Sequence, residues 1–435
     1  MNPPAPAAES ISLKPNPDPD PLARHMNPTL QLLAGCLLGA ALSATAQDAP
    51  APKTFKVAVE TNDLARIAVT PPLPADGRVP AGTVLKVAIT PAAGQALDSG
   101  YYTTPGPWGR AYHEFSSPTF PVAVTQDIGI GASLIDAGAL AGFKLIPDVV
   151  YAQPGVKKLK YDVFTPDGAK HLPIVVIIHG GGWSSNTEDV MRGLARELVR
   201  GGRYVAVSMD YRWIGRGDGD KEPNSMANLV EDVYGGILHI REHALEYGGD
   251  PDRVAVTGDS AGGHLSAAAI NLIERIGDQG FGVKEGVYEF KPTYLPAGKT
   301  VAQARAELLH AVQVAAPSYG VFTGPMLGGR GARSSAAALD AVAPLANIPA
   351  AKSRPAPQLL LRGTRDTLIQ DAAVQAYADA LKAAGQKAEY VQVEGAAHAF
   401  FDWKPDAGTK ATFAKYGVPN AAKMQAFFDA VFYPK

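Results

Sequence analysis

A serine between glycines is the residue of this chain best placed to do chemistry. Residues 258–263, GDSAGG, contain the pattern G-x-S-x-G around Ser260. A strand-like apolar run comes before the pattern and a helix-like run follows it, which is the setting of a nucleophile held on a sharp turn. The flanking glycines leave room where side chains would collide. The pattern therefore predicts that the Ser260 hydroxyl attacks an electrophilic carbon such as a carbonyl carbon.

A serine nucleophile needs a general base, and the base needs a group that orients it. Asp366 follows the strand-like run QLLLRG, and His398 follows the next strand-like run, EYVQVEG. The order serine, acid, histidine and the positions after strand ends both fit such a relay. Asp371 is a competing acid, but it begins a helix-like run and is expected to be a cap or first-turn carboxylate. We therefore predict Asp366 as the acid and His398 as the base.

Three consecutive glycines follow another apolar run, in VVIIHGGGW at residues 175–183. Glycine has no Cβ, so its N–H can approach the oxyanion that forms when a serine attacks a carbonyl. We predict an oxyanion hole made by the backbone N–H groups of Gly180, Gly181 and Ala261. The alternatives are a glycine turn without a ligand or a phosphate loop, but the Lys and Ser/Thr that a phosphate loop needs after its glycines are missing.

Other polar residues near these motifs have structural interpretations. His179 is expected to hold the glycine run by a hydrogen bond, and His264, one helical turn after the serine, is expected to pack. Asp210 and Arg212 in MDYRW are expected to form an internal ion pair that shapes the site. His, Cys and carboxylates show no metal-ligand spacing, so we predict neither a metal nor a cofactor.

Alternating strand-like and helix-like segments from residue 136 to residue 435 must position these groups. Short apolar strands between amphipathic helices predict an α/β fold with a doubly wound, mainly parallel sheet covered on both faces. The chemistry of such sheets lies at the carboxyl ends of the strands. The strand candidates are 158–164, 174–180, 204–210, 254–260, 312–317, 358–363 and 389–395, and the helix candidates are 189–200, 226–245, 261–276, 372–385 and 421–432.

Residues 47–135 have a different pattern, with short alternating runs such as FKVAVE and TVLKVAITP between Pro- and Gly-rich turns. Alternation with a period of two predicts a small β-sandwich-like module. A packing or spacer role is expected for this β module. Carbohydrate binding is the alternative, suggested by four aromatic residues close together: Tyr101, Tyr102, Trp108 and Tyr112.

Residues 1–46 are expected to be a leader region, with translation starting at Met26. An apolar run at residues 30–42 precedes the small-residue motif Ala-Thr-Ala, which predicts signal-peptide cleavage before Gln47 and export to the periplasm or the medium. The run is too short to span a bilayer, so no stable membrane insertion is expected. A lipoprotein anchored through Cys36, the only cysteine, is the rival interpretation.

The composition is that of an ordinary globular protein. The chain has 435 residues, of which 46% are hydrophobic and 19% are charged, and its formal net charge is −2. Without an excess of basic residues or a long basic block, nucleic-acid binding is not expected. The oligomeric state is not predicted.

Together, these motifs resemble those of the α/β-hydrolase carboxylesterases, in particular the hormone-sensitive-lipase-like and bacterial feruloyl/acetyl esterase-like groups. The resemblance implies the same assignment of Ser260, Asp366, His398 and the three oxyanion donors. The matching segments are YDVFTP (161–166), PIVVIIHGGGW (173–183), DYRW (210–213), DPDRVAVTGDSAGGHLSAAA (250–269), LLLRGTRDTLI (359–369) and GAAHAF (395–400).

The chain also departs from that family's pattern. The long N-terminal cap helices of lipase-like members are absent and the β module precedes the domain, while the usual D-P-L acid motif reads D-T-L. An insert at residues 277–309 separates the helix after the serine from the next strand. Its proline- and aromatic-rich part is expected to pack on the β module, and a lid over the site is the alternative.

The resemblance implies an exported serine carboxylesterase that works through an acyl-enzyme without a cofactor. The expected substrate is a short-chain or aromatic acyl ester, either a small molecule or a polysaccharide that carries acetyl or feruloyl groups. One alternative is a serine exopeptidase of the same fold, although the 85-odd residues of the β module are too few for the propeller domain that such relatives usually carry. Another is a non-catalytic binding protein, which the complete set of catalytic residue types disfavours.

Overall fold

Two hydrophobic cores organise the part of the chain that this computed structural model describes, residues 52–106, 109–328 and 334–435. Pro52–Lys435 forms one unit by its internal contacts. The smaller core belongs to strands before Asp136, and the larger core belongs to the sheet and helices that follow. The predicted leader, start at Met26 and Cys36 anchor lie outside the described residues.

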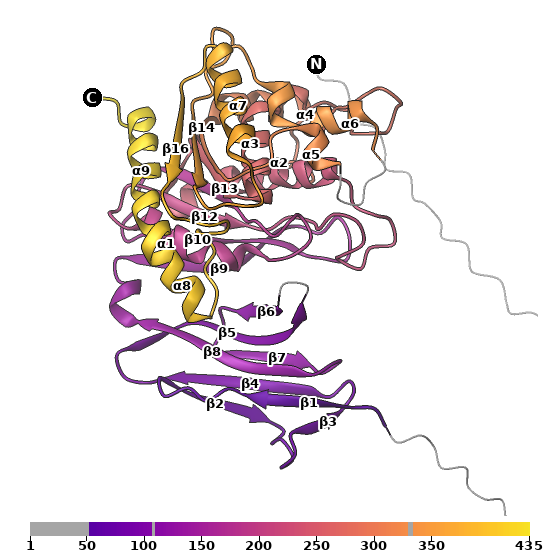
Figure 1. Cartoon of the computed structure of the whole chain (residues 1–435), viewed down its shortest axis with the longest axis vertical. Helices are drawn as coiled ribbons and strands as arrows, with labels where there is room; N and C mark the ends of the chain where they lie inside the picture. The colour runs from indigo at the N-terminus through magenta and orange to yellow at the C-terminus, as the bar shows by residue number, and fades with distance from the viewer. Residues whose placement is uncertain (1–51, 107–108, 329–333) are drawn as a thin grey trace, which may run out of the picture. The chain divides into compact units, whose positions relative to one another are not determined.

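The smaller core lies in an all-β region of two sheets (Figure 1). Strand β4 shows the alternation predicted from the sequence, because Leu85, Val87 and Ile89 are buried and the residues between them are more exposed. The five-stranded sheet has the order β3-β1-β8-β5-β6, and the three-stranded sheet has the order β2-β4-β7. The strands are β1 (Thr54–Val59), β2 (Ala65–Thr70), β3 (Arg78–Pro80), β4 (Val84–Pro91), β5 (Gln95–Gly106), β6 (Gly109–Phe115), β7 (Thr119–Ala123) and β8 (Ile128–Asp136).

The larger core surrounds an eight-stranded sheet of order β16-β15-β14-β13-β11-β12-β10-β9. The run from β16 to β12 is parallel, and β10 and β9 are antiparallel at one edge. All seven predicted strands are present, and only β9, an exposed edge strand, was not predicted. The strands are β9 (Phe143–Ala152), β10 (Leu159–Pro166), β11 (Leu172–Ile178), β12 (Val205–Met209), β13 (Gly249–Asp259), β14 (Val312–Ser318), β15 (Gln358–Gly363) and β16 (Ala388–Val393).

Helices cover both faces of this sheet, with α1 packed against α9 and α2 packed against α3 (Figure 1). The doubly wound, mainly parallel α/β fold is therefore confirmed. The α-helices are α1 (Arg192–Val199), α2 (Met226–Glu242), α3 (Ala261–Asn271), α4 (Val301–Ala311), α5 (Gly324–Leu327), α6 (Ala336–Val342), α7 (Asp371–Ala383), α8 (Ala407–Thr412) and α9 (Val418–Phe432). Short helical turns are η1 (Ala137–Leu140), η2 (Glu188–Met191), η3 (Ala244–Tyr247), η4 (Ile273–Arg275), η5 (Pro344–Asn347) and η6 (Phe413–Gly417).

A buried ion network connects β5 to α1. The carboxylate of Asp98 accepts hydrogen bonds from Arg196 at 2.8 Å, Arg192 at 3.3 Å and the indole N–H of Trp403 at 2.8 Å. Burial by itself raises the pKa of Asp98, but Arg192 and Arg196 outweigh it and hold that pKa far below its usual value. The charged carboxylate therefore fixes strand β5 of the β module to α1, the helix that follows the glycine run.

Asp98→Ala is expected to lower the free energy of unfolding by about 3–5 kcal/mol, because it leaves the buried Arg196 guanidinium without a carboxylate partner and removes one of the three carboxylates that pair with Arg192. Denaturant titration followed by circular dichroism measures this loss. Glu389→Ala is the control, since the Lys387–Glu389 pair is 3.7 Å apart with side chains 56% and 53% exposed. It should cost less than about 1 kcal/mol. Similar small losses in both variants would show that the Asp98 network contributes no more than a surface pair.

The insert at residues 277–309 packs on α2, so the expectation that it packs on the β module is wrong. The Thr293 N–H donates to the Glu231 carbonyl at 3.1 Å, and the Thr293 hydroxyl donates to the Asp232 carboxylate at 2.5 Å. Phe290 is completely buried in the larger core. The physical reason is that buried carboxylates on α2 need donors, which this segment supplies together with an apolar anchor.

Candidate active site

The predicted nucleophile lies on the turn between β13 and α3. Ser260 has φ 52° and ψ −112°, a strained conformation for a residue with a side chain. A Cβ on Gly262 would lie 1.9 Å from the carbonyl oxygen of Ile178, and one on Gly258 would lie 2.4 Å from the same oxygen. The glycines are therefore required by close backbone approach, as the sequence pattern predicts.

The structure brings together the three residues predicted as nucleophile, base and acid. His398 Nε2 lies 2.9 Å from Ser260 Oγ, and His398 Nδ1 lies 2.8 Å from Asp366 Oδ2. An ionised carboxylate can only accept, so Nδ1 carries the hydrogen and Nε2 is left to accept the serine proton. The arrangement can therefore activate the serine hydroxyl as a nucleophile.

The Asp366 carboxylate is held in its charged form. Its Oδ1 accepts the backbone N–H groups of Leu368 at 2.9 Å and Ile369 at 3.0 Å. Burial raises the pKa of Asp366, but the hydrogen bonds from His398 and Ile369 outweigh it and keep that pKa below its usual value. The buried Arg362 donates to the Asp366 carbonyl at 2.8 Å and to the Ile369 carbonyl at 2.6 Å, which fixes the loop.

Asp371 is engaged elsewhere. It is the first residue of α7 and accepts hydrogen bonds from the Tyr390 hydroxyl at 2.6 Å and the Gln392 amide at 2.8 Å, both on β16. The prediction of a first-turn carboxylate is confirmed.

The glycine loop (residues 180–182) corrects the predicted oxyanion donors. The Gly180 N–H donates to Asp259 Oδ1 at 2.6 Å, so it does not point to a substrate as predicted. Among the residues that the structure describes, the N–H groups of Gly181, Gly182 and Ala261 have no protein acceptor. Gly181 and Gly182 have φ of 117° and 60°, which glycine adopts readily. The sequence pattern could not identify which glycine amide faces the Asp259 carboxylate.

Sequence reasoning missed the second layer of residues under the site. Burial raises the pKa of Asp259 well above its usual value, and the neighbouring Asp402 raises it further. The ring of buried Tyr319 lies 4.9 Å from the His398 ring and packs edge-on against it. Asp259 lies inside the GDSAGG motif and Tyr319 directly follows β14, so their positions at strand ends could have identified both.

The two other histidines near the motifs act as predicted. His179 Nδ1 lies 2.6 Å from the Gly180 carbonyl oxygen and therefore helps to hold the glycine loop. His264 is completely buried, with Nε2 2.9 Å from the Val342 carbonyl oxygen and Nδ1 accepting the Trp183 indole N–H at 3.2 Å. Both are expected to position the site rather than to react.

The predicted ion pair between Asp210 and Arg212 is replaced by two separate pairs. Asp210 pairs with Lys157 at 2.8 Å, and Arg212 pairs with Asp232 on α2 at 2.8 Å. The physical reason is that the fold brings partners from other elements close to each residue, which neighbours in sequence cannot reveal.

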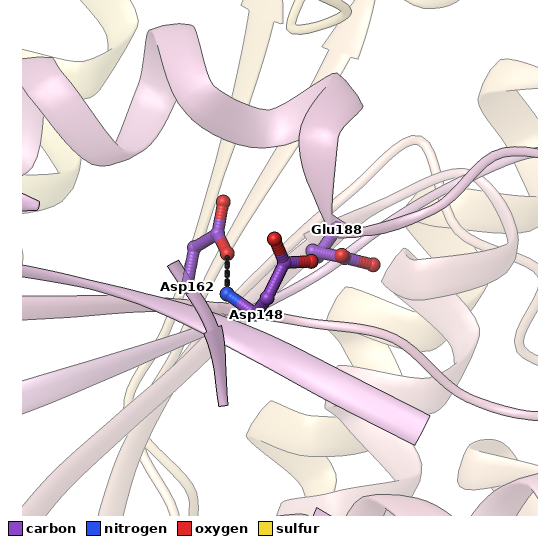
Figure 2. Close-up of side chains that lie close together, drawn as sticks. All are labelled: Asp148, Asp162 and Glu188. Atoms are coloured by element: carbon purple, nitrogen blue, oxygen red, sulfur yellow. Dashed lines mark hydrogen bonds between the residues drawn. The ribbon is translucent and has the colours of Figure 1, made fainter. Parts of the chain in front are cut away.

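Three carboxylates that are separated in sequence lie close together in Figure 2: Asp148 on β9, Asp162 on β10 and Glu188 on η2. The Asp148 N–H donates to Asp162 Oδ1 at 2.8 Å. The Lys160 ammonium binds Asp148 and lies 3.0 Å from Glu188. Because this ammonium already supplies positive charge, we assign the cluster to internal ion pairing. The absence of a metal requirement stays a prediction.

Within residues 52–106, 109–328 and 334–435, helices that are both long and apolar enough to cross a membrane are absent.

The chain belongs to the α/β-hydrolase fold family, whose family model matches residues 175–402, more than half of the chain. This match confirms the fold class, and together with the esterase relatives that follow it confirms the resemblance to α/β-hydrolase carboxylesterases derived from the motifs.

Curated relatives of this chain include esterases. The chain is 32% identical over 166 residues to carboxylesterase NlhH of Mycobacterium tuberculosis, which covers 37% of this chain and 50% of NlhH. It is 27% identical over 261 residues to esterase LipQ of the same organism, covering 58% of this chain and 56% of LipQ. The chain thus spans about half the length of the curated relatives it matches.

Solved structures show the same fold. Native esterase 2 of Thermogutta terrifontis aligns with a TM-score of 0.50 at 24% identity, over 68% of this chain and 95% of that chain. The tabun-treated form of that esterase aligns with the same TM-score and identity over 98% of that chain.

Proposed function

We propose that this protein is an exported serine carboxylesterase that hydrolyses short-chain or aromatic acyl esters, including acetyl and feruloyl groups on polysaccharides. The observation that carries the proposal is the hydrogen-bonded chain from Ser260 through His398 to Asp366. The names of the relatives NlhH and LipQ support the ester as substrate class. We also propose residues 47–135 as the β module and residues 136–435 as the catalytic domain, because each has its own hydrophobic core.

The proposed reaction begins when Ser260 Oγ attacks the acyl carbon and its proton moves to His398 Nε2. The Asp366 carboxylate stabilises the imidazolium that forms. The oxyanion accepts hydrogen bonds from the free N–H groups of Gly181, Gly182 and Ala261. When the carbon–oxygen bond breaks, His398 returns the proton to the leaving alcohol, and an acyl-enzyme remains. Water, deprotonated by the same histidine, then releases the acid and restores the serine.

A panel of p-nitrophenyl esters of increasing acyl length tests the reaction class. Acetylated xylan, feruloylated xylan and an aminoacyl anilide are assayed in parallel. We expect turnover of the short esters and little turnover of the anilide. Hydrolysis of the anilide alone would assign a peptidase, and hydrolysis of none would refute the enzymatic proposal.

Export is tested by the N-terminus of the mature protein. We expect a chain that begins at Gln47 in the periplasm or medium, because the small-residue motif before it fits signal-peptide cleavage. Mass spectrometry of protein purified from fractionated cells of the native host measures this. A cytoplasmic protein with an intact leader would contradict export, and a lipid-modified Cys36 would replace secretion by anchoring.

Replacing residues 287–296 by a Gly/Ser linker of equal length tests the insert. Loss of the buried Phe290 and of the Thr293 hydrogen bonds should lower the free energy of unfolding by roughly 3–5 kcal/mol. The preference among acyl lengths should stay that of the unmodified protein, since the segment packs on α2. Denaturant titration and the p-nitrophenyl panel measure the two effects. A changed acyl-length preference would instead support the lid.

A further inference from the structure

A pocket of about 290 Å³ lies between the edge strand β6 and the segment that follows the glycine loop. The β module contributes Tyr102, Tyr112 and His113 to its lining. The catalytic domain contributes Asn186 and Trp213. This volume is at the lower limit of small-molecule sites, which combine apolar surface with a few polar groups.

The wall of this pocket is continuous with the glycine loop. The Ser185 hydroxyl, which lines the pocket, donates to the Gly181 carbonyl at 2.8 Å. The Trp213 indole N–H donates to the Asn186 carbonyl at 3.0 Å and fixes the aromatic ring to the same segment. Ser185 therefore connects the lining of this pocket directly to the loop that contains Gly181.

The lining carries no uncompensated charge, which favours a neutral ligand. Arg110 pairs with Glu60 at 2.7 Å, and Lys404 pairs with Asp402 at 2.9 Å. Lys160 lies 3.0 Å from Glu188. The acids Glu114 and Asp189 both pair with Arg192, and burial lowers the pKa of His113, which favours its neutral form. A phosphate or carboxylate would find every cation already paired.

The chemical character of the lining matches a sugar ring. Tyr102 and His113 are stacked with centroids 4.4 Å apart, and Tyr112 and Trp213 add two half-buried aromatic rings. Aromatic rings pack well against the C–H faces of a pyranose. Hydroxyl, amide and imidazole groups around the rings, including those of Asn186 and Tyr112, can hydrogen-bond the hydroxyls of the sugar.

We propose that this pocket, the sugar pocket, binds a neutral pyranose unit of the alcohol part of the substrate, so that the β module takes part in substrate recognition. The inference rests on the proposed esterase function for the reaction at Ser260. The substrate class becomes an acyl ester on a neutral sugar, such as a xylo-oligosaccharide.

Binding is tested without turnover by titrating the full-length Ser260→Ala protein with unsubstituted xylotetraose in a calorimeter. We expect saturable binding that weakens about tenfold or more when Tyr112→Ala is added, because a central aromatic contact is lost. Tyr288→Ala, an aromatic truncation in the insert outside the pocket lining, is the matched control and should leave binding unchanged. Methyl ferulate is the second probe, and binding of methyl ferulate but not xylotetraose in this pocket would overturn the sugar assignment.

The same variants are tested in the active protein by the ratio of kcat/KM for acetylated xylotetraose to kcat/KM for p-nitrophenyl acetate. Tyr112→Ala should lower this ratio about tenfold. If the alanine variant does not fold, the milder Tyr112→Leu replaces it and should also lower the ratio. An unchanged ratio would refute the sugar pocket. Hydrolysis of p-nitrophenyl acetate without any binding of xylotetraose would refute the sugar-pocket proposal and leave the esterase proposal intact. A protein that binds xylotetraose but hydrolyses no ester would refute only the esterase function.

Discussion

Ser260→Ala is expected to lower kcat for p-nitrophenyl acetate by about 10⁴- to 10⁶-fold, and His398→Ala is expected to lower it equally. The reason is that neither residue acts without the other: His398 Nε2 lies 2.9 Å from Ser260 Oγ and has no proton to take when the hydroxyl is missing. The double variant should be no slower than either single variant. Steady-state kinetics with active-site titration measures all three.

Correct folding is the control for these variants. Circular dichroism and the midpoint of thermal unfolding should match those of the unmodified protein, because Ser260 contributes its side chain to the relay and its backbone to the turn. Turnover near that of the unmodified protein in Ser260→Ala would remove this serine from the mechanism. If the fold-loss of kcat in the double variant equalled the product of the two single losses, the two residues would act independently.

Asp366→Asn is expected to lower kcat by about 10⁴-fold while the fold is retained. The amide oxygen can still accept the backbone N–H groups of Leu368 and Ile369, which turns the amide nitrogen toward His398 Nδ1. Two donors cannot face each other, so the imidazole must take the tautomer with hydrogen on Nε2. That tautomer cannot accept the proton of Ser260. The predicted loss thus comes from a single proton in the wrong place.

Asp371→Asn is the matched control for this experiment. It makes the same chemical change five residues later, at an exposed carboxylate that binds Tyr390 and Gln392. We expect kcat to change by no more than about twofold. Equal losses in the two asparagine variants would leave the acid unassigned, and a loss in Asp371→Asn alone would transfer the role to Asp371.

The fold class could be predicted because its signals are local. Fully apolar runs such as IVVIIHG predict strands buried on both faces, and the helix-like runs between them predict the layers. The same dependence on local signals explains why strand β9 was not predicted. It is an edge strand in which only Tyr151 is fully buried, and its sequence FKLIPDVVYA shows neither a continuous apolar run nor strict alternation.

The partners of the insert and of the charged residues could not be predicted. Whether residues 277–309 lie on the β module or on α2 depends on which buried acids need donors, and Glu231 and Asp232 become buried only when α2 packs. Asp98 and Arg192 are 94 residues apart, and no sequence pattern indicates that they meet. Pairing between distant charges is decided by the packing of the elements that carry them.

The sequence by itself determined which residue types follow which strands. It therefore identified Ser260, Asp366 and His398 as the residues that meet at the carboxyl ends of the parallel strands. Because the carboxyl ends of parallel strands lie on the same side of the sheet, knowing which residue follows each strand was sufficient for that prediction. Only the tertiary structure decided which glycine amides are free, because the Gly180 N–H is donated to Asp259, a carboxylate on a neighbouring strand. The direction of an N–H group depends on φ and ψ and on its partner in space, and neither is encoded by a run of identical glycines.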